Sequence, residues 1–481
     1  MEEAKETKLG DLVLGATLGS GSFGMVREIT DTGVVKAVKS FIPRKHTLDN
    51  IIGVEFPTEL DAYCRLAHPN LMAADRLLIE NGQIHIVMPL MQTNATEWAD
   101  EKKRSLADLI SVIHQTACAA DFLLSQKLFN GDIRPDNVLI RETKEGIQAK
   151  ITDFGSLLRI DGRHIPVHPL YSISIPEFLS PENLHAMVSG RGVAYSEKDV
   201  VWQLGMLIMS LVGETLPPRG EDDELADKAV LQWNERWLTE IGQRKHTLKT
   251  FFERDDAGSL IELTAGMLDP EVKQRFTMAQ VLAHPVFKGK VVPQGTMLAA
   301  PLLKRVDCPM SIQRVTDFFV VVNDYNGDTG GILFAVVDLI YRSIGLLDKP
   351  SRQDVLAHNF ACIYLGIKLY RNQLMKDNIY LFNRVRREPS VVLQYFQRFG
   401  VSVDDVLKME LWLIAALRGY LYRPYIFDSF TDSTVLLEAM DKVVPHPELY
   451  YEAEATLSVK GEATDAKPNI HDFIATRAII L

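Results

Sequence analysis

The 481-residue sequence contains few cysteines and no long apolar run. Its cysteines number four and form no C-x-x-C pair: Cys64, Cys118, Cys308 and Cys362. This count argues against a disulfide framework or a zinc site and favours reduced, buried thiols. The longest apolar stretches, such as Ile332–Val337, are far too short to cross a bilayer. Because the first residues are charged rather than apolar, we expect no signal peptide and an intracellular protein in the cytoplasm or the nucleus.

The sequence also has no excess of basic residues. Lys and Arg total 52 against 63 Asp and Glu, which gives a formal net charge of −11. The bulk charge therefore predicts no direct nucleic-acid binding. The hydrophobic content of 47% and the charged content of 24% are those of an ordinary globular protein. At this length we expect about two to four domains, whose cores need no disulfide or metal.

The hydrophobic periodicity changes several times along the chain. Residues 11–91 alternate apolar and polar residues between glycines, which predicts an antiparallel sheet interrupted by one helix at roughly 49–66. Residues 105–126 have a helical period and predict a long helix with a buried face. Short strands are expected at 137–140 and 149–154, and helices resume after Pro181.

These changes divide the chain into five parts. A break in periodicity that contains two prolines and two glycines predicts a linker between two folded regions. The expected parts are an N-terminal tail at 1–10, a first domain at 11–287, the linker at 288–307, an all-helical domain at 308–440 and a C-terminal tail at 441–481.

A glycine-rich segment lies between two of the predicted strands. It consists of Gly19, Ser20, Gly21, Ser22, Phe23 and Gly24. A dinucleotide-binding fingerprint requires a helix after the third glycine, whereas a strand is expected here. The context favours a loop whose backbone N–H groups cover nucleotide phosphates, and the simpler alternative is a glycine-rich hairpin.

Two charged residues follow, and the family resemblance given below implies that they form an ion pair. Lys39 closes a predicted strand fifteen residues after Gly24, and Glu59 lies on the predicted helix nine residues before His68. Glu55, one turn earlier on the same helix face, is the alternative partner. A lysine at a strand end is usually only solvated, so the pair gains weight from the residues that follow.

Further polar residues come after the long helix in a fixed order. Asp132 and Asn137 belong to the segment Asn-Gly-Asp-Ile-Arg-Pro-Asp-Asn, and Asp153 opens an Asp-Phe-Gly tripeptide sixteen residues later. Together with the glycine segment, Lys39 and Glu59, this set resembles the eukaryotic-type protein kinases, and within them the cyclin-dependent-kinase-like enzymes. The resemblance covers residues 11–287. It implies an α+β, bilobal fold with a small antiparallel β lobe and a larger helical lobe.

The resemblance implies ATP and Mg²⁺ as cofactors and a role for each residue. Lys39, paired with Glu59, would hold the α- and β-phosphates, Asp132 would accept or orient the substrate hydroxyl proton, and Arg134 would reach the γ-phosphate. Asn137 and Asp153 would ligate Mg²⁺. An arginine two residues after the catalytic aspartate suggests Ser/Thr specificity. The glycine segment would cover the phosphates, Val26 and Ala37 would form the apolar roof over adenine, Met88 would be the gatekeeper, and Met91 would belong to the hinge.

The larger lobe carries additional matches and some departures. Glu182, in a Ser-Pro-Glu tripeptide, is expected to pair with Arg275. The departures are Asn130 and Gly131 in place of the usual His and Arg, Ile175 in place of a threonine, and Val200 in place of an aspartate, which stands one position earlier as Asp199. They lower the activity that we expect without arguing against nucleotide binding. Because Gly131 cannot pair with a phosphate, phosphorylation of the activation segment 153–182 has lost one receptor.

Three apolar helices are expected in the second domain, at 330–344, 353–370 and 402–417, the last opened by a Ser402–Asp405 capping box. Lys368 and Glu410, with the segment 423–430, stand in patterns that resemble a cyclin box. This resemblance implies an all-α bundle whose Lys368 and Glu410 contact a kinase regulatory helix, its own or another's. The simpler alternative is that Lys368 complements a helix C-terminus and Glu410 is a solvated helix charge.

Three functions remain open on the sequence. The first is an ATP-dependent Ser/Thr kinase that phosphorylates a protein substrate and is regulated by its fused cyclin-like domain. The second is a pseudokinase scaffold that binds nucleotide but transfers little. The third is a cyclin-like module that binds another kinase or a transcription component in trans.

Overall fold

The chain folds into two compact units, described by a computed structural model. The first unit is Met1–Pro43 with Thr58–Leu298, and the second is Arg44–Pro57 with Ala299–Leu481. The structure describes residues 8–9, 12–21, 24–41, 55–80, 83–100, 105–159, 178–188, 195–212, 258–298, 336, 338–340, 342–369, 397 and 399–421.

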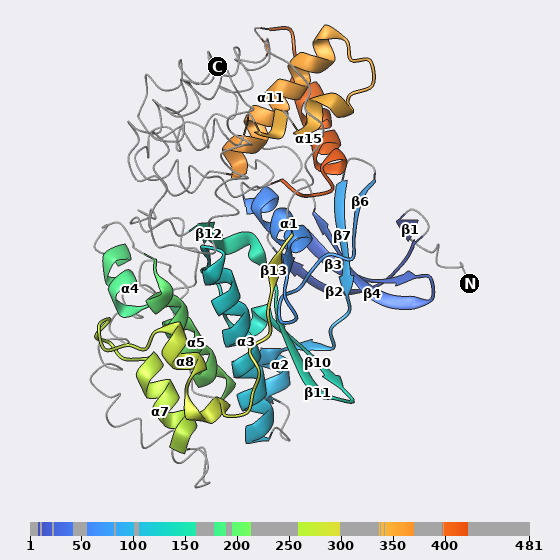
Figure 1. Cartoon of the computed structure of the whole chain (residues 1–481). Coiled ribbons are helices and arrows are strands. Elements are labelled where there is room, and N and C mark those ends of the chain that lie inside the picture. Colours follow the sequence, from blue (N-terminus) through green and yellow to red (C-terminus); the bar gives the residue numbers. More distant parts are fainter. Residues whose placement is uncertain are drawn as a thin grey trace, which may run out of the picture. The chain divides into compact units, whose positions relative to one another are not determined.

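A six-stranded antiparallel sheet forms the N-terminal part of the first unit (Figure 1). Its order in space is β1 (Lys8–Leu9), β2 (Leu12–Gly21), β3 (Gly24–Asp31), β4 (Val34–Phe41), β7 (Gln83–Pro89) and β6 (Arg76–Glu80). Side chains alternate between the two faces of a strand, and one face buries a cluster formed by Leu9, Leu12, Ile29, Val38 and Val87. The antiparallel sheet predicted for residues 11–91 is confirmed.

One helix, α1 (Glu55–Arg65), accompanies this sheet and leads directly into the short strand β5 (Leu66–Ala67). It falls within the helix predicted at 49–66, of which residues 49–54 lie outside the described residues. The face that α1 buries includes Glu59, Leu60 and Tyr63. A buried glutamate on an apolar helix face requires a partner, because an unpaired charge away from water is costly.

The helical part of the first unit is organised around α3 (Leu106–Ser125), which begins at a capping box between Ser105 and Asp108. The long helix predicted at 105–126 is therefore confirmed. By length and composition alone α3 could cross a membrane, but eleven of its twenty residues are buried, as in a core helix. Two helices contact it, α5 (Glu197–Leu211) and α8 (Met278–Leu282). The helical part also contains α2 (Ala95–Asp100), α4 (Pro181–Val188) and α7 (Gly258–Met267) (Figure 1).

Short strands lie between the sheet and the helices. β10 (Val138–Thr143) pairs with β11 (Gly146–Ile151) and β8 (Thr93–Asn94), and β9 (Leu128–Asn130) pairs with β12 (Leu157–Arg159). The strand predicted at 149–154 is wrong at its C-terminal end, since β11 stops at Ile151. Asp153 has a φ of 59°, outside the extended region, and residues Phe154–Ser156 form a 3₁₀ turn.

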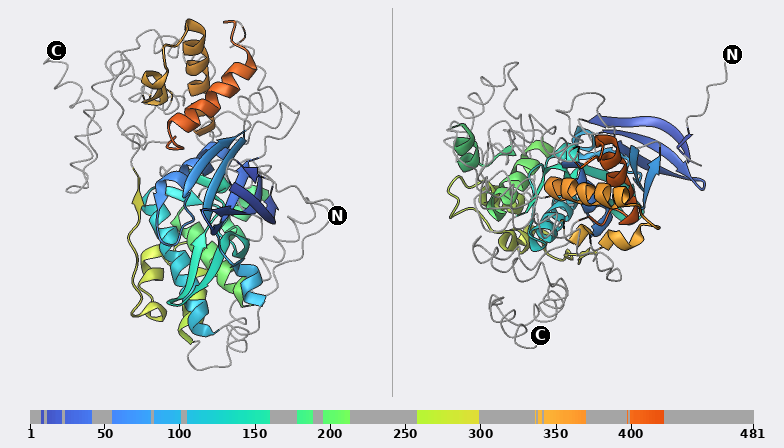
Figure 2. Two further views of the ribbon diagram at one scale, coloured as in Figure 1. Left: turned by 90° about the vertical axis from the view of Figure 1, so that its right-hand side faces the viewer. Right: turned by 90° about the horizontal axis from the view of Figure 1, so that it is seen from above.

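The predicted linker begins with an ordered segment of the first unit. After the 3₁₀ turn Pro285–Phe287, the chain runs beside the helices and forms β13 (Thr296–Met297), which pairs antiparallel with β5 at the end of α1 (Figures 1 and 2). Residues far apart in sequence are thereby joined at the C-terminal end of α1.

The described part of the second unit contains α11 (Arg352–Leu369) and α15 (Val403–Ala416), which pack against each other, and a 3₁₀ turn at Ile344–Leu346. The capping box between Ser402 and Asp405 is present as predicted. Most of the first predicted helix and the segment 423–430 lie outside the described residues. Cys64, Cys118 and Cys362 are free thiols, and Cys308 lies outside the described residues.

Candidate active site

Strand register in the six-stranded sheet places several of the predicted nucleotide-binding residues on neighbouring strands. Ala37 pairs with Met88 across β4 and β7, and Val26 pairs with Lys39 across β3 and β4. Ala37, Met88 and Met91 are buried, and Val26 is half-buried. The register therefore brings Val26, Ala37 and Met88 onto three neighbouring strands, whereas Met91 follows β7.

The glycine segment forms the end of the β2–β3 hairpin, where Gly21 pairs with Gly24. A Cβ atom at Gly24 would lie 2.4 Å from the carbonyl oxygen of Ser40, so only glycine allows β3 to approach β4 at this point. A Cβ at Gly19 would meet no atom within 4 Å, which leaves open space beside the hairpin. Ser20 lies in β2, and Ser22 and Phe23 lie outside the described residues.

An ion pair joins Lys39 on β4 to Glu59 on α1. Their side chains are 12% and 1% exposed, respectively. Burial opposes the charge on Lys39, but Tyr63, Glu59 and Asp153 outweigh it and raise the pKa of the ammonium group above its ordinary value. Glu59 is therefore the partner of Lys39 in this structure, and the side chain of the alternative, Glu55, lies outside the described residues.

The segment between β9 and β10 positions the predicted catalytic aspartate. The Asp132 amide donates to Oδ1 of Asn130 at 3.1 Å, and Nδ2 of Asn137 donates to Oδ2 of Asp132 at 2.7 Å. Nε of Arg134 lies 3.2 Å from Oδ1 of Asp132, and the other end of its guanidinium lies 2.7 Å from Asp136. Burial raises the pKa of Asp132, while Arg134 and Asn137 partly oppose the shift.

Asp153 stands in a left-handed backbone conformation, with φ 59° and ψ 81°. Such a conformation in a non-glycine residue is uncommon and is concentrated at functional sites. The Asp153 amide donates to the hydroxyl oxygen of Tyr63 at 3.2 Å, and the Tyr63 ring lies edge-on to Phe154 at 4.8 Å. Sequence reasoning missed Tyr63, although its position one turn after Glu59 places it on the same face of α1.

Hydrogen bonds support the backbone of the catalytic segment near two of the departures. Asn130 is buried and, through Oδ1, holds the backbone of Asp132. Val200 is buried, and α5 instead reaches the catalytic segment through Gln203, whose Nε2 donates to the Gly131 carbonyl at 2.8 Å. Gln203 was not predicted, because a single glutamine in an apolar helix gives no sequence signal for the atom to which it will donate.

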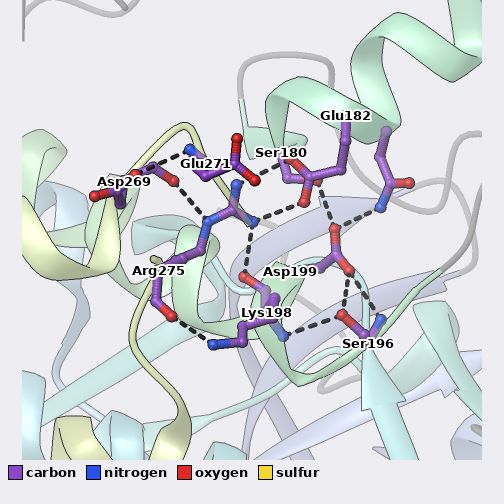
Figure 3. A network of polar contacts seen from close by, with 9 residues as sticks. Ser180, Glu182, Ser196, Lys198, Asp199, Asp269, Glu271 and Arg275 are labelled. Carbon is purple, nitrogen blue, oxygen red and sulfur yellow. Dashed lines mark hydrogen bonds and ion pairs between the residues drawn. The ribbon is translucent and has the colours of Figure 1, made fainter. Parts of the chain in front are cut away.

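The predicted pair between Glu182 and Arg275 is present as a two-pronged contact, with distances of 2.7 and 2.9 Å (Figure 3). Arg275 is buried and lies over the Trp202 ring at 4.9 Å. Asp199 sits beside this pair, where it accepts hydrogen bonds from Ser180 and from the amide of Ser196. Burial raises the pKa of Asp199 to about 6, against the effect of these hydrogen bonds.

The donor set fits a nucleotide that arrives with Mg²⁺. Because Nδ2 of Asn137 donates to Asp132, its Oδ1 is left as the atom able to ligate a cation. Among the described residues, no group of three or more His, Cys, Asp or Glu side chains could hold a metal ion. Mg²⁺ in phosphoryl-transfer sites is bound by one or two carboxylates together with substrate phosphates. Asp153 supplies one carboxylate, and the amide oxygen of Asn137 is a further oxygen ligand.

Comparison with known proteins agrees with this geometry. Residues 12–287 match the family described as the protein kinase domain. Aurora kinase of Eremothecium gossypii is 27% identical over 263 residues, which cover 53% of this chain and 67% of that protein. The rat serine/threonine-protein kinase DCLK1 is 26% identical over 297 residues, covering 59% of this chain and 61% of the rat protein.

Human serine/threonine-protein kinase DCLK2 is 25% identical over 310 residues, covering 61% of this chain and 36% of that protein. The matches therefore span about two thirds or less of these relatives. The chain belongs to the protein kinase family, and its kinase domain is of the serine/threonine type. The predicted protein kinase is thus confirmed at the level of the family, whereas the cyclin-dependent-kinase-like subtype and the cyclin box stay predictions.

Proposed function

We propose that this chain is an active kinase that transfers the γ-phosphoryl group of ATP to Ser or Thr hydroxyls of a protein substrate, inside the cell. The observation that carries the proposal is the buried Lys39–Glu59 pair, together with the charge of Asp153, which helps to raise the pKa of Lys39. Phosphoryl transfer depends almost entirely on positioning and on stabilising charge. A lysine fixed in place by a buried carboxylate is a preorganised phosphate ligand.

The reaction would use groups already held in place by the chain. The glycine segment and Lys39 would bind the phosphates, and Asn137 with Asp153 would hold Mg²⁺, which neutralises charge on the phosphate oxygens. The bond from the γ-phosphorus to the bridging oxygen breaks as a bond to the substrate hydroxyl oxygen forms. Asp132 receives the hydroxyl proton, and ADP leaves. The raised pKa of Asp132 favours this acceptance.

Arg134 would stabilise the charge that develops on the transferred group. Its guanidinium contacts both Asp132 and Asp136, and the side chain as a whole is 28% exposed. Arginine is always protonated and presents several donors in a plane, which suits a phosphoryl group. The pseudokinase alternative loses support, since Asn130 and Gln203 supply contacts at two departures.

The test is transfer of radiolabelled phosphate from ATP to an array of Ser, Thr and Tyr peptides, with wild type beside Asp132→Asn. The substitution keeps the shape of the side chain and removes the proton acceptor. We expect labelled Ser or Thr peptides for wild type and a loss of about 10²- to 10⁴-fold for the variant, the usual contribution of a positioned base. Nucleotide binding followed by thermal shift should persist in both proteins. Equal transfer by both proteins, or no nucleotide binding by wild type, would overturn the proposal.

We further propose that the second unit regulates the kinase by contacting α1. Lys368 and Glu410, the residues expected at a cyclin contact, lie on α11 and α15. The side chain of Lys368 lies outside the described residues, and Glu410 is only 3% exposed, so the alternative of a solvated charge at Glu410 is wrong. The path of the chain also supports the proposal, since Leu298 hydrogen-bonds with Arg65 at the end of α1. A tether that starts there gives an effective concentration on the order of millimolar.

The regulatory proposal is tested with Lys368→Ala in the full-length chain, beside the control Lys408→Ala, whose side chain is 71% exposed. We expect the first variant to lower peptide phosphorylation without changing the thermal stability of either unit. Full activity in Lys368→Ala would reject contact in cis. Binding of another kinase by the wild type but not by Lys368→Ala would then favour the trans function.

A further inference from the structure

The segment Val291–Leu298, called the strap below, closes on the last residue of α1. The amide of Leu298 donates to the Arg65 carbonyl at 2.8 Å, and Nε of Arg65 donates to the Leu298 carbonyl at 3.0 Å. Thr296 and Met297 pair with Ala67 and Leu66 in the adjoining strand ladder. One of the carbonyls that a helix leaves unpaired at its C-terminus is thus satisfied by the strap.

The Arg65 side chain is enclosed at this junction. It is 1% exposed and also lies 3.4 Å from Oδ2 of Asp61, one turn earlier on α1. A buried guanidinium is costly unless it is paired and hydrogen-bonded. The Leu298 carbonyl supplies one of these hydrogen bonds, so the strap forms part of the environment that keeps Arg65 inside.

Gly295 packs the strap closely against α3 and against the segment that follows α1. A Cβ at this position would lie 2.6 Å from the ring of Phe122 and 2.9 Å from that of His68. These two rings stack with centroids 5.1 Å apart. Burial lowers the pKa of His68, against the opposing effect of the Pro293 backbone. The strap therefore lies flat on α3 and on the connection out of α1, where only glycine fits.

We propose that the strap is a positioning element for catalysis, because it holds α1 where Glu59 pairs with Lys39. Glu59 and Arg65 lie on the same eleven-residue helix, and a short helix moves as one body. Contacts at Arg65 and His68 restrain the C-terminal end of that body. Release of the strap would let α1 shift and would weaken the ion pair. The proposal rests on the proposed kinase function only for its activity readout, not for the position of α1.

The first experiment uses full-length Gly295→Val beside Val291→Ser, a control in the same strap at a side chain that is 82% exposed. Hydrogen exchange is measured for peptides from α1 and from α5, together with kcat and KM for ATP. We expect exchange of α1 to rise about tenfold or more in Gly295→Val, because the added side chain would overlap the rings of Phe122 and His68, with α5 unchanged. kcat should fall and KM for ATP should rise. Val291→Ser should behave as wild type.

A second pair of variants covers the case in which Gly295→Val does not fold. Leu298→Pro removes the amide that donates to Arg65, whereas Leu298→Ala keeps it, and the side chain is 40% exposed. We expect the proline variant alone to raise α1 exchange, by about 3- to 10-fold for one lost hydrogen bond. Unchanged α1 exchange in both disrupted variants, or an equal rise in α1 and α5, would overturn the proposal. Because exchange is read without turnover, an inactive wild type would refute the kinase function and leave this test intact.

Discussion

The candidate active site in the first unit and an ion pair in the second unit both contain charged side chains, but these are enclosed to different degrees. In the first unit, the side chains of Lys39 and Asp132 remain 12% and 16% exposed. In the second unit, Arg342 and Asp338 form an ion pair at 2.6 Å with side chains only 4% and 0% exposed. Arg342 also donates to the carbonyls of Tyr420 and Leu421. The first arrangement leaves charge open to a ligand, whereas the second satisfies it internally.

A second buried polar group in the second unit follows the same pattern. Nε2 of His358 lies 2.7 Å from Oγ of Ser343, and Asn359 and Cys362 lie beside it. Ser343, His358 and Cys362 are all 0% exposed. A nucleophile and a base without access to solvent hold a fold together rather than act on a substrate. The comparison therefore supports chemistry in the first unit and a structural role for these buried groups in the second.

The largest expected effect comes from removing Lys39 from the candidate active site of the first unit. Lys39→Met should lower kcat/KM by about 10²- to 10⁴-fold, because it removes a phosphate ligand and leaves Glu59 buried without its cation. The matched control is Lys36→Met on the same strand, which removes a half-exposed lysine paired with Asp31 and Asp75. Steady-state phosphorylation of the best array peptide measures both. Similar losses in the two variants would contradict a special role for Lys39.

The next largest effect should come from disrupting the buried ion pair between Arg342 and Asp338 in the second unit. Arg342→Ala removes the buried cation that pairs with Asp338, and we expect it to lower the free energy of unfolding of the second unit by about 3–5 kcal/mol. Lys408→Ala removes an exposed partner of Asp404 and should change it by less than about 0.5 kcal/mol. Denaturant unfolding followed by hydrogen exchange in α11 distinguishes the two. An Arg342→Ala chain as stable as Lys408→Ala would show that the Arg342–Asp338 pair does not stabilise the second unit.

A smaller effect should appear with pH in the second unit. Burial lowers the pKa of His358 to about 4 from 6.5. Because the folded-state pKa lies below the unfolded value, the stabilisation is complete above pH 6.5 and is lost as the pH falls toward 4. At pH 5 the loss should be about 2 kcal/mol. His358→Gln should flatten the pH dependence of α11 exchange between pH 7 and 5, and an unchanged slope in that variant would contradict the assignment.

The smallest expected effect is that of phosphatase treatment. Gly131 offers no side chain to a phosphate, and its carbonyl is already bonded to Gln203. The rate should therefore change by less than about twofold when phosphate is removed from the activation segment, whose candidate sites Tyr171, Ser172 and Ser174 lie outside the described residues. A large loss of activity, restored by rephosphorylation at one of these sites, would show that another receptor replaces the missing arginine.

The sequence allowed the catalytic residues to be predicted because their chemistry requires fixed residue types at fixed spacings. Lys39 with Glu59 and Glu182 with Arg275 were both expected, and both pairs form. The capping box at Ser402 was visible for the same reason, since it depends on two residues three positions apart. These features are local or belong to a recognisable order along the chain.

The supporting contacts could not be predicted, because each depends on packing between distant segments. β13 and β5 are two residues long and lie far apart in sequence, so no periodicity signals their pairing. Gln203 and Asn130 compensate for departures through single hydrogen bonds whose geometry only the folded chain defines. β11 ends at Ile151, and Asp153 that follows it has a positive φ of 59°. An apolar sequence pattern does not encode such a dihedral angle.

The most direct test of the kinase assignment is phosphate transfer by Asp153→Ala, measured against wild type over a Mg²⁺ titration with radiolabelled ATP and the best Ser or Thr peptide. Asp153 is the carboxylate that would hold the metal against the phosphates. We predict Mg²⁺-dependent transfer by wild type and a rate lower by about 10³-fold or more for the variant, with the melting temperature of both units preserved. Transfer by Asp153→Ala at the wild-type rate, or transfer by wild type that does not depend on Mg²⁺, would contradict the account.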